Sequence, residues 1–232
     1  MKDSLNIGLL AFYPFNSNTK DLSGHNYNGT AHNLISAEDR FRNPNAAYDF
    51  NGINSYITVK DNIPLRLSKT DFTLNYWINL TSYSNSYGSV VIGKRSFGYA
   101  NGWITGVGGM GNIASVIGKA GTVTYNVSGG GDPFAYGQIV VRLEGWHMIT
   151  VTYSYALSRI NTYIDGVFDS TTYNIPTPNE LTDSDMYIGA DSQGNDNPSS
   201  DDYLVKGKID DIRIYNRIIG TKELHRLFIA TQ

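Results

Sequence analysis

Alternating apolar and polar positions mark several parts of this chain as β-strands. The clearest case is residues 72–79, where Phe72, Leu74, Tyr76 and Ile78 are separated by Thr, Asn and Trp residues. A period of two places alternate side chains on opposite faces of a strand. The pattern therefore predicts a strand over 72–79 with one face turned toward a core.

Shorter extended segments recur along the rest of the chain, with turn-forming residues between them. The strongest are 146–153 and 208–215, and the dipeptide Asp165–Gly166 predicts a hairpin turn after residues 159–164. The weaker segments are 9–15, 46–50, 55–59, 89–93, 103–107, 113–117, 122–127 and 185–189. Only residues 221–230 show helical spacing of apolar side chains, so the sequence predicts one short helix near the C-terminus.

Composition supports an all-β protein that forms one domain over residues 1–232. The chain contains 24 Gly and 17 Tyr, and only four of its 21 acidic residues are the better helix former Glu. We count twelve to fourteen expected strands and find no linker, which favours an antiparallel β-sandwich or barrel. The fold class expected is therefore an all-β, antiparallel β-sandwich with one short C-terminal helix.

Charge and cysteine content exclude several classes of function. The 18 basic and 21 acidic residues give a net charge of −3, which provides no field for nucleic acid. The absence of Cys excludes disulfides, thiol catalysis and thiolate metal sites. The apolar runs are too short for membrane insertion, and residues 1–6 lack the features of a signal peptide.

Seven stretches, in order along the chain, resemble the concanavalin A-like, laminin G-like domains. The most characteristic are Phe72–Ile78, similar to an FTLSAWV strand, and Gly145–Tyr153, similar to GWHHVAVTY. The others are Leu10–Phe15, Asp21–Gly24, Tyr48–Gly52, Tyr163–Gly166 and Gly207–Arg217. The resemblance implies a jelly roll of two antiparallel sheets, a fold that carries lectins, hydrolases and protein-binding domains alike.

Glycoside hydrolysis would require two carboxylates about 5–10 Å apart. The four Glu residues are far apart in sequence, and no Glu-x-Asp-x-x-Glu motif occurs. Asp210 and Asp211 are adjacent on an expected strand, so they should point to opposite faces and form a poor catalytic pair. We therefore expect a protein that is not an enzyme, with a hydrolase as the less favoured alternative.

The loops are rich in Asp and Asn, whose oxygen atoms suit Ca²⁺ rather than Zn²⁺. The resemblance implies a structural calcium ion bound by Asp210, with backbone oxygens near Asn16 and Gly52. Asp21 is a second carboxylate in plausible reach. The alternative is that Asp21 caps its own turn and Asp210 pairs with Arg213 or a backbone amide.

Aromatic and amide side chains suited to sugars gather in two segments outside the family motifs. We expect the ligand-binding residues to be Tyr99, Asn101, Trp103, Asp191, Gln193 and Asn195. The pentraxins, distant relatives on this sandwich, hold ligands through calcium at two comparable segments, although Gln193 stands where they would have an acid. That the two segments meet is an expectation taken from the related fold.

Three other prominent side chains have a structural explanation. Trp77, Trp146 and His147 belong to strand motifs, so we expect them to be packed or hydrogen-bonded. The resulting prediction is a non-catalytic, lectin-like carbohydrate-binding module, part of a larger extracellular or cell-surface protein. A protein-binding or structural module of the same fold is the alternative.

Overall fold

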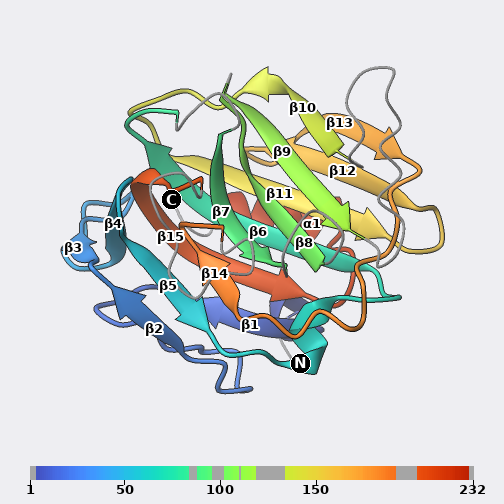
Figure 1. Cartoon of the computed structure of the whole chain (residues 1–232). Coiled ribbons are helices and arrows are strands. Elements are labelled where there is room, and N and C mark those ends of the chain that lie inside the picture. The colour runs from blue at the N-terminus through green and yellow to red at the C-terminus, as the bar shows by residue number, and fades with distance from the viewer. Residues whose placement is uncertain are drawn as a thin grey trace.

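A computed structural model of the chain describes residues 4–83, 88–95, 102–109, 111–118, 134–191 and 203–229. Within these ranges the chain forms two β-sheets packed face to face, which confirms the expected antiparallel sandwich (Figure 1). The short helices are η1 (Ser4–Asn6) and η2 (Ile63–Arg66), and the α-helix is α1 (Thr221–Ile229). None of these helices has the length and apolar character that crossing a bilayer requires.

The sheet that contains β6 is called the β6 sheet. Its strands in spatial order are β13 (Val167–Tyr173), β12 (Arg159–Ile164), β11 (His147–Ser154), β6 (Phe72–Leu80), β15 (Lys206–Tyr215), β4 (Ala47–Asn51) and β3 (Ile35–Ala37). In addition, β1 (Leu9–Tyr13) pairs with β15. The long strand β15 therefore pairs with β1 and β4 along one edge and with β6 along the other.

The second sheet is called the β7 sheet and lies in front of the β6 sheet in Figure 1. Its strands in spatial order are β10 (Phe134–Val140), β9 (Asn112–Gly118), β8 (Gly102–Val107), β7 (Ser89–Lys94), β14 (Met186–Ile188), β5 (Tyr56–Val59) and β2 (Gly29–His32). Every strand pairing in the described ranges is antiparallel.

The hydrophobic pattern located most strands within one or two residues. Strands β2, β3 and β10 were not expected, because β2 and β3 are short and largely polar or exposed. The expected segment 122–127 lies outside the described residues. The helix expected over 221–230 is confirmed as α1.

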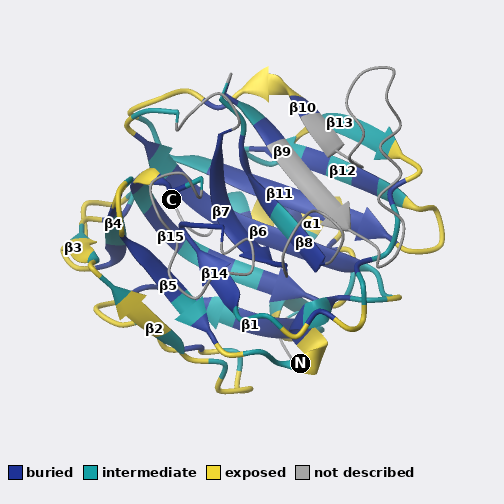
Figure 2. Cartoon of the chain, viewed as in Figure 1, coloured by how far each residue is buried: buried dark blue, intermediate teal, exposed yellow. Residues whose placement is uncertain are grey.

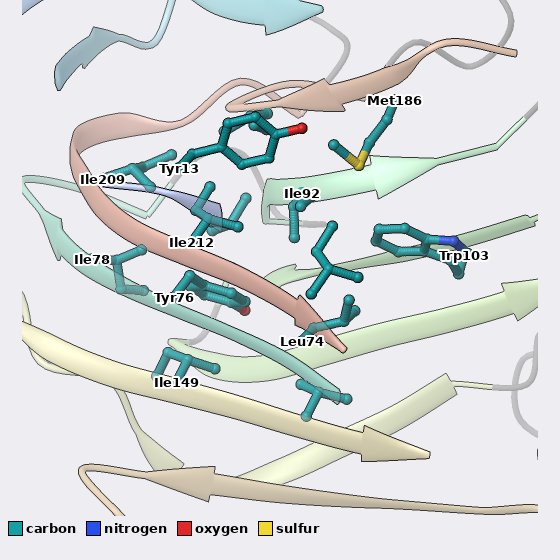
Figure 3. Packing of buried hydrophobic residues seen from close by; sticks show 14 of the residues in the cluster. Tyr13, Leu74, Tyr76, Ile78, Ile92, Trp103, Ile149, Met186, Ile209 and Ile212 are labelled. Atoms are coloured by element: carbon teal, nitrogen blue, oxygen red, sulfur yellow. The ribbon is translucent and has the colours of Figure 1, made fainter. Parts of the chain in front are cut away.

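The main core forms where the inward side chains of the two sheets interleave (Figure 3). From β6 come the alternate residues predicted by period two, including Leu74, Tyr76 and Ile78. They face residues of the opposite sheet such as Ile92 and Met186. Each fully buried aliphatic side chain contributes about 1.5–3 kcal/mol, so this face supplies most of the stability.

The opposite face of β6 is buried as well, which explains why almost the whole strand is dark blue in Figure 2. Helix α1 packs Leu224 and Leu227 onto a second cluster that contains Trp77 and Met148. The ring of Phe228 stacks on Trp77, with centroids 5.8 Å apart and planes 7° apart. Trp77 is thus a packing residue, as expected.

Strand β15 contains an irregularity that changes which way its side chains point. The register with β6 shifts between Asp210 and Arg213, and Asp211 has a φ of 49°. Both Asp210 and Asp211 consequently reach the same guanidinium, that of Arg40. The expectation that these two carboxylates point to opposite faces is wrong, because a β-bulge interrupts the alternation.

An ion pair fastens the end of β15 to the start of α1 and to the N-terminal segment. Arg217 donates to both carboxylate oxygens of Glu223 at 2.8 Å and to the carbonyl oxygens of Ser4 and Ile7. Glu223 also accepts a hydrogen bond from the Gly220 amide at 3.0 Å. The hydrogen bonds from Arg217 lower the pKa of Glu223 to about 2, although partial burial opposes the shift.

The Glu223 pair predicts a specific acid dependence of stability. A carboxyl group with a depressed native pKa stabilises the fold above its unfolded pKa, about 4.5, and loses this contribution as pH falls toward 2. Glu223→Gln should therefore lower the free energy of unfolding by about 1–3 kcal/mol at pH 7. Urea denaturation of both proteins from pH 7 to pH 2.5 should show the gap closing; a gap independent of pH would contradict the assignment.

Candidate functional site

Strand β7 ends at the cation Lys94 and is followed directly by a second cation, Arg95; the two residues are 0% and 3% exposed. Buried charges need partners, since an unpaired ion in a protein interior is strongly destabilising. Lys94 donates to Asp61 at 2.5 Å and to the carbonyl oxygen of Ser184. Arg95 forms a bidentate pair with Asp191, with one contact of 2.8 Å from Nε to Oδ1.

The Arg95–Asp191 pair joins the bases of the two segments expected to bind ligand. Arg95 immediately precedes residues 96–101, and Asp191 immediately precedes residues 192–202. The neighbouring strands support this junction, because β7 pairs with both β8 and β14 and the Gly189 amide donates to the Val91 carbonyl. The two segments therefore start from the same place on the β7 sheet.

Four of the six expected ligand residues, Tyr99, Asn101, Gln193 and Asn195, lie outside the described residues. Asp191 is described, and its carboxylate is 2% exposed and occupied by Arg95. Asp191 therefore anchors the start of residues 192–202. This role could have been suspected from the sequence only by pairing it with a cation 96 residues away.

Trp103 is a core residue, so the expectation that its ring offers a platform for sugar is wrong. It is 1% exposed, belongs to the main core, and points between the sheets in Figure 3. Its indole N–H donates to the carbonyl oxygen of Leu65 at 3.0 Å, which ties β8 to η2. Asn101 and Gly102 precede Trp103, and this polar, glycine-containing approach concealed an inward-facing position on β8.

The charges around Lys94 form a connected group. Arg66 donates to Asp61 through Nε at 3.3 Å and Nη2 at 2.5 Å, and through Nη1 to the Glu180 carbonyl at 2.8 Å. Burial opposes ionisation of Asp61, but the hydrogen bonds from Arg66 and Lys94 outweigh it and lower the pKa of Asp61. Burial also lowers the pKa of Lys94, against the attraction of Asp61.

A cavity of about 360 Å³ opens beside this charged group. It lies between η2, the residues that follow η2, and the ends of β1 and β15. Its lining combines apolar side chains with Arg, Ser, Thr, Asn and Glu: Leu10, Ile63, Pro64, Arg66, Leu67, Ser68, Thr70, Glu180 and Asn216. The sequence analysis did not identify this cavity, because its lining comes from four distant parts of the chain.

The predicted calcium ligand Asp21 has its carboxylate fully engaged in its own turn. It accepts hydrogen bonds from the amides of Phe12, Ser23 and Tyr27 at 2.9–3.0 Å and from the Ser23 hydroxyl at 2.8 Å. This is the turn-capping role given as the alternative. The carbonyl oxygen of Asn16 likewise accepts from the Asn18 side chain at 2.7 Å.

Gly52 and Asp210 also have structural roles. Gly52 has a φ of 70°, and a Cβ there would lie 2.9 Å from the Cβ of Lys206, so the turn requires glycine. Asp210 is 2% exposed and pairs with Arg40. Burial raises the pKa of Asp210, the Asp211 carboxylate raises it further, and the Arg40 guanidinium opposes both.

The donor set around Asp210 does not fit a calcium ion, because a guanidinium already contacts the carboxylate that would bind it. Over the described ranges, no three His, Asp or Glu side chains come together in a group that could hold a metal. Calcium binding elsewhere in the chain stays a prediction. His147 is hydrogen-bonded to Asp165, with 2.8 Å between Nδ1 and Oδ2, as expected for a structural histidine.

Comparison with known proteins identifies the fold family. The model of the concanavalin A-like lectin/glucanases superfamily matches residues 51–225. Among curated protein sequences, none matches this one.

Solved structures resemble the chain over almost its whole length. Domain 4 of AbnA, a GH43 extracellular arabinanase from Geobacillus stearothermophilus solved with arabinotriose, has a TM-score of 0.68 and 17% identity, covering 94% of this chain and 97% of that one. The binding domain of Paraclostridial Mosquitocidal Protein 1 has a TM-score of 0.70 and 17% identity, covering 98% of this chain and 53% of that one.

The binding domain of Botulinum neurotoxin DC, solved with rat synaptotagmin II, has a TM-score of 0.65 and 15% identity over 99% of this chain and 53% of that one. The chain therefore spans about half the length of the two toxin binding domains. Identities this low establish the shared fold. Two of these three structures are binding domains by name.

The anchor role of Asp191 predicts a large loss of stability on removing its charge. Asp191→Asn leaves Arg95 buried without its anion and should lower the free energy of unfolding by about 3–5 kcal/mol. The matched control is Glu180→Gln, which breaks the exposed Lys69–Glu180 pair and should cost at most about 1 kcal/mol. Urea denaturation measures both, and equal small losses would show that the Arg95–Asp191 pair is not an anchor.

Proposed function

Because the chain belongs to the concanavalin A-like lectin/glucanases superfamily, we propose that it is a non-catalytic carbohydrate-binding module. The observation that carries this proposal is the near end-to-end match with an arabinanase domain that was solved with arabinotriose bound. That match covers almost all of both chains, whereas the toxin domains extend well beyond this one. A module of a larger extracellular or cell-surface protein is the setting that such neighbours favour.

We place the glycan on the β7 sheet, at residues 96–101 and 192–202. The buried Arg95–Asp191 pair supports this placement, since it holds the bases of both segments together at a fixed point. Tyr99 would stack on a sugar ring, and the amides of Asn101, Gln193 and Asn195 would bind hydroxyl groups. Trp103 lies in the core and would not contact the sugar.

A non-catalytic role agrees with how the described carboxylates are used. Asp210 and Asp211 share Arg40, Asp61 pairs with Lys94, and Asp191 pairs with Arg95. A glycosidase needs one carboxylic acid and one free carboxylate on either side of the scissile bond. These four carboxylates are paired with buried cations, so they stabilise the fold and are not available as a catalytic acid or base.

A protein-binding module is the second candidate, and one surface favours it. Strand β13 at the edge of the β6 sheet exposes Val167, Phe168 and Tyr173, which are 62%, 54% and 62% exposed. Exposed apolar side chains that gather on one strand can form a contact surface for another protein. A botulinum neurotoxin domain of the same fold was solved with a protein bound.

The proposal predicts glycan binding that depends on the 96–101 segment. On a glycan array that includes arabino-oligosaccharides, the chain should bind at least one class, and calorimetry should then give its Kd. Tyr99→Ala should raise that Kd by roughly tenfold or more, since a stacked aromatic anchor contributes at least about 1.4 kcal/mol.

Tyr173→Ala is the matched control, because it removes an exposed tyrosine from the edge of the other sheet. Its Kd should equal that of the unsubstituted chain. A blank array would overturn the carbohydrate proposal and favour the protein-binding candidate. Equal effects of the two substitutions would overturn the placement of the site.

A further inference from the structure

The connection from β3 to β4, residues 38–46, inserts one arginine into the outer face of the β6 sheet. The side chain of Arg40 is 7% exposed. Its guanidinium lies 4.5 Å from the ring centroid of Trp77 and 4.6 Å from that of Phe41. Trp77 is itself covered by Phe228, so Arg40 belongs to a stack of planar groups that links α1, β6 and this connection.

The guanidinium meets two carboxylates in the plane of its N–H groups. Nη1 donates to Asp210, and Nη2 donates to Asp211 at 2.6 Å. Asp210 lies directly opposite Trp77 in the pairing of β15 with β6, which explains why one side chain can contact both. The bulge at Asp211 turns the second carboxylate toward the same cation.

The connection is shaped so that it presents Arg40. The preceding residue, Asp39, accepts hydrogen bonds from the amides of Phe41 and Asn43 at 2.8 and 2.9 Å, and from the Asn43 side chain at 2.9 Å. These bonds close a tight turn around Arg40. The turn positions the arginine in advance of its contact with β15, so little rotamer freedom is lost on pairing.

We propose that Arg40 is the resident cation of the Asp210–Asp211 carboxylate pair and that it takes the place of a divalent metal ion there. The carboxylates need a cation, because the buried Asp210 and the partly buried Asp211 are adjacent, so that two anions there repel each other and lose hydration. A guanidinium meets that need through its fork of N–H donors. The domain is then stable without calcium at this position.

The surroundings of Arg40 suit a guanidinium and not a metal ion. Calcium takes six to eight oxygen ligands at about 2.3–2.6 Å. The Arg40 guanidinium lies over the rings of Trp77 and Phe41, which offer a π-face and no oxygen. An arginine can make cation–π contacts with the two rings and donate hydrogen bonds to the two carboxylates at the same time.

The first test is thermal unfolding of the unsubstituted chain in excess EDTA and in millimolar Ca²⁺. Asp210→Asn is measured alongside, and the shift between EDTA and Ca²⁺ should be the same in both proteins to within about 1 °C, because the chelator removes no ion from Asp210. A melting temperature several degrees lower in EDTA, together with one Ca²⁺ bound per chain by calorimetry and lost in Asp210→Asn, would overturn the proposal. This readout is independent of glycan binding.

The second test removes the cation itself. Arg40→Ala should lower the melting temperature by about 5–15 °C, since it removes the cation paired with buried Asp210 and leaves Asp211 with its longer, 3.6 Å contact to Arg213. Adding Asp210→Asn to that variant should recover part of the loss, because the amide carries no charge. Arg42→Ala, in the same connection and exposed, is the control and should change the melting temperature by at most about 2 °C.

The same variants show how the proposal would fail. An Arg40→Ala melting temperature equal to that of the Arg42 control would mean that the carboxylates do not depend on Arg40. A double variant less stable than Arg40→Ala alone would mean that Asp210 has another native partner. Should Arg40→Ala fail to fold, Arg40→Lys keeps the charge without the fork, and a melting temperature unchanged by it would contradict the role of the guanidinium.

Discussion

The arrangement of this domain depends on the need to neutralise buried positive charge at the edge of its core. Lys94 and Arg95 lie side by side at the end of β7 and are almost completely excluded from solvent. Lys94 fixes the approach to η2 through Asp61, and Arg95 fixes the start of the 192–202 segment through Asp191. Because a lone buried charge is so unfavourable, these pairs determine which loops meet on the β7 sheet.

The outer faces of the two sheets differ in how they are covered. The outer face of the β6 sheet is closed by α1 and by the Arg40 connection, which cover Trp77 from two sides. On the β7 sheet, the Arg95–Asp191 pair joins the two positions from which residues 96–101 and 192–202 begin. The β6 sheet therefore has a covered outer face, whereas the β7 sheet carries loops whose sequence can vary. Variation of loops on a constant scaffold allows one fold to support many ligands.

Sequence periodicity predicted the parts of the fold that follow from local geometry. The alternation over residues 72–79 identified the inward face of β6, and the resemblance placed the strands in a jelly roll. It failed where contacts are distant or the alternation breaks. Trp103 follows Asn101 and Gly102 and looked exposed, Asp211 lies at a bulge, and Arg40 is 170 residues from Asp210, so no local pattern could reveal their roles.

The proposed binding site lies on the β7 sheet, beside the paired bases at Arg95 and Asp191. The most direct measurement is amide hydrogen exchange of the chain with and without a bound oligosaccharide. Protection should increase in residues 95–105 and 186–205 and stay unchanged in α1 and β11. Increased protection confined to α1, β12 and β13 would place the ligand on the β6 sheet and would show that the proposed site on the β7 sheet is wrong.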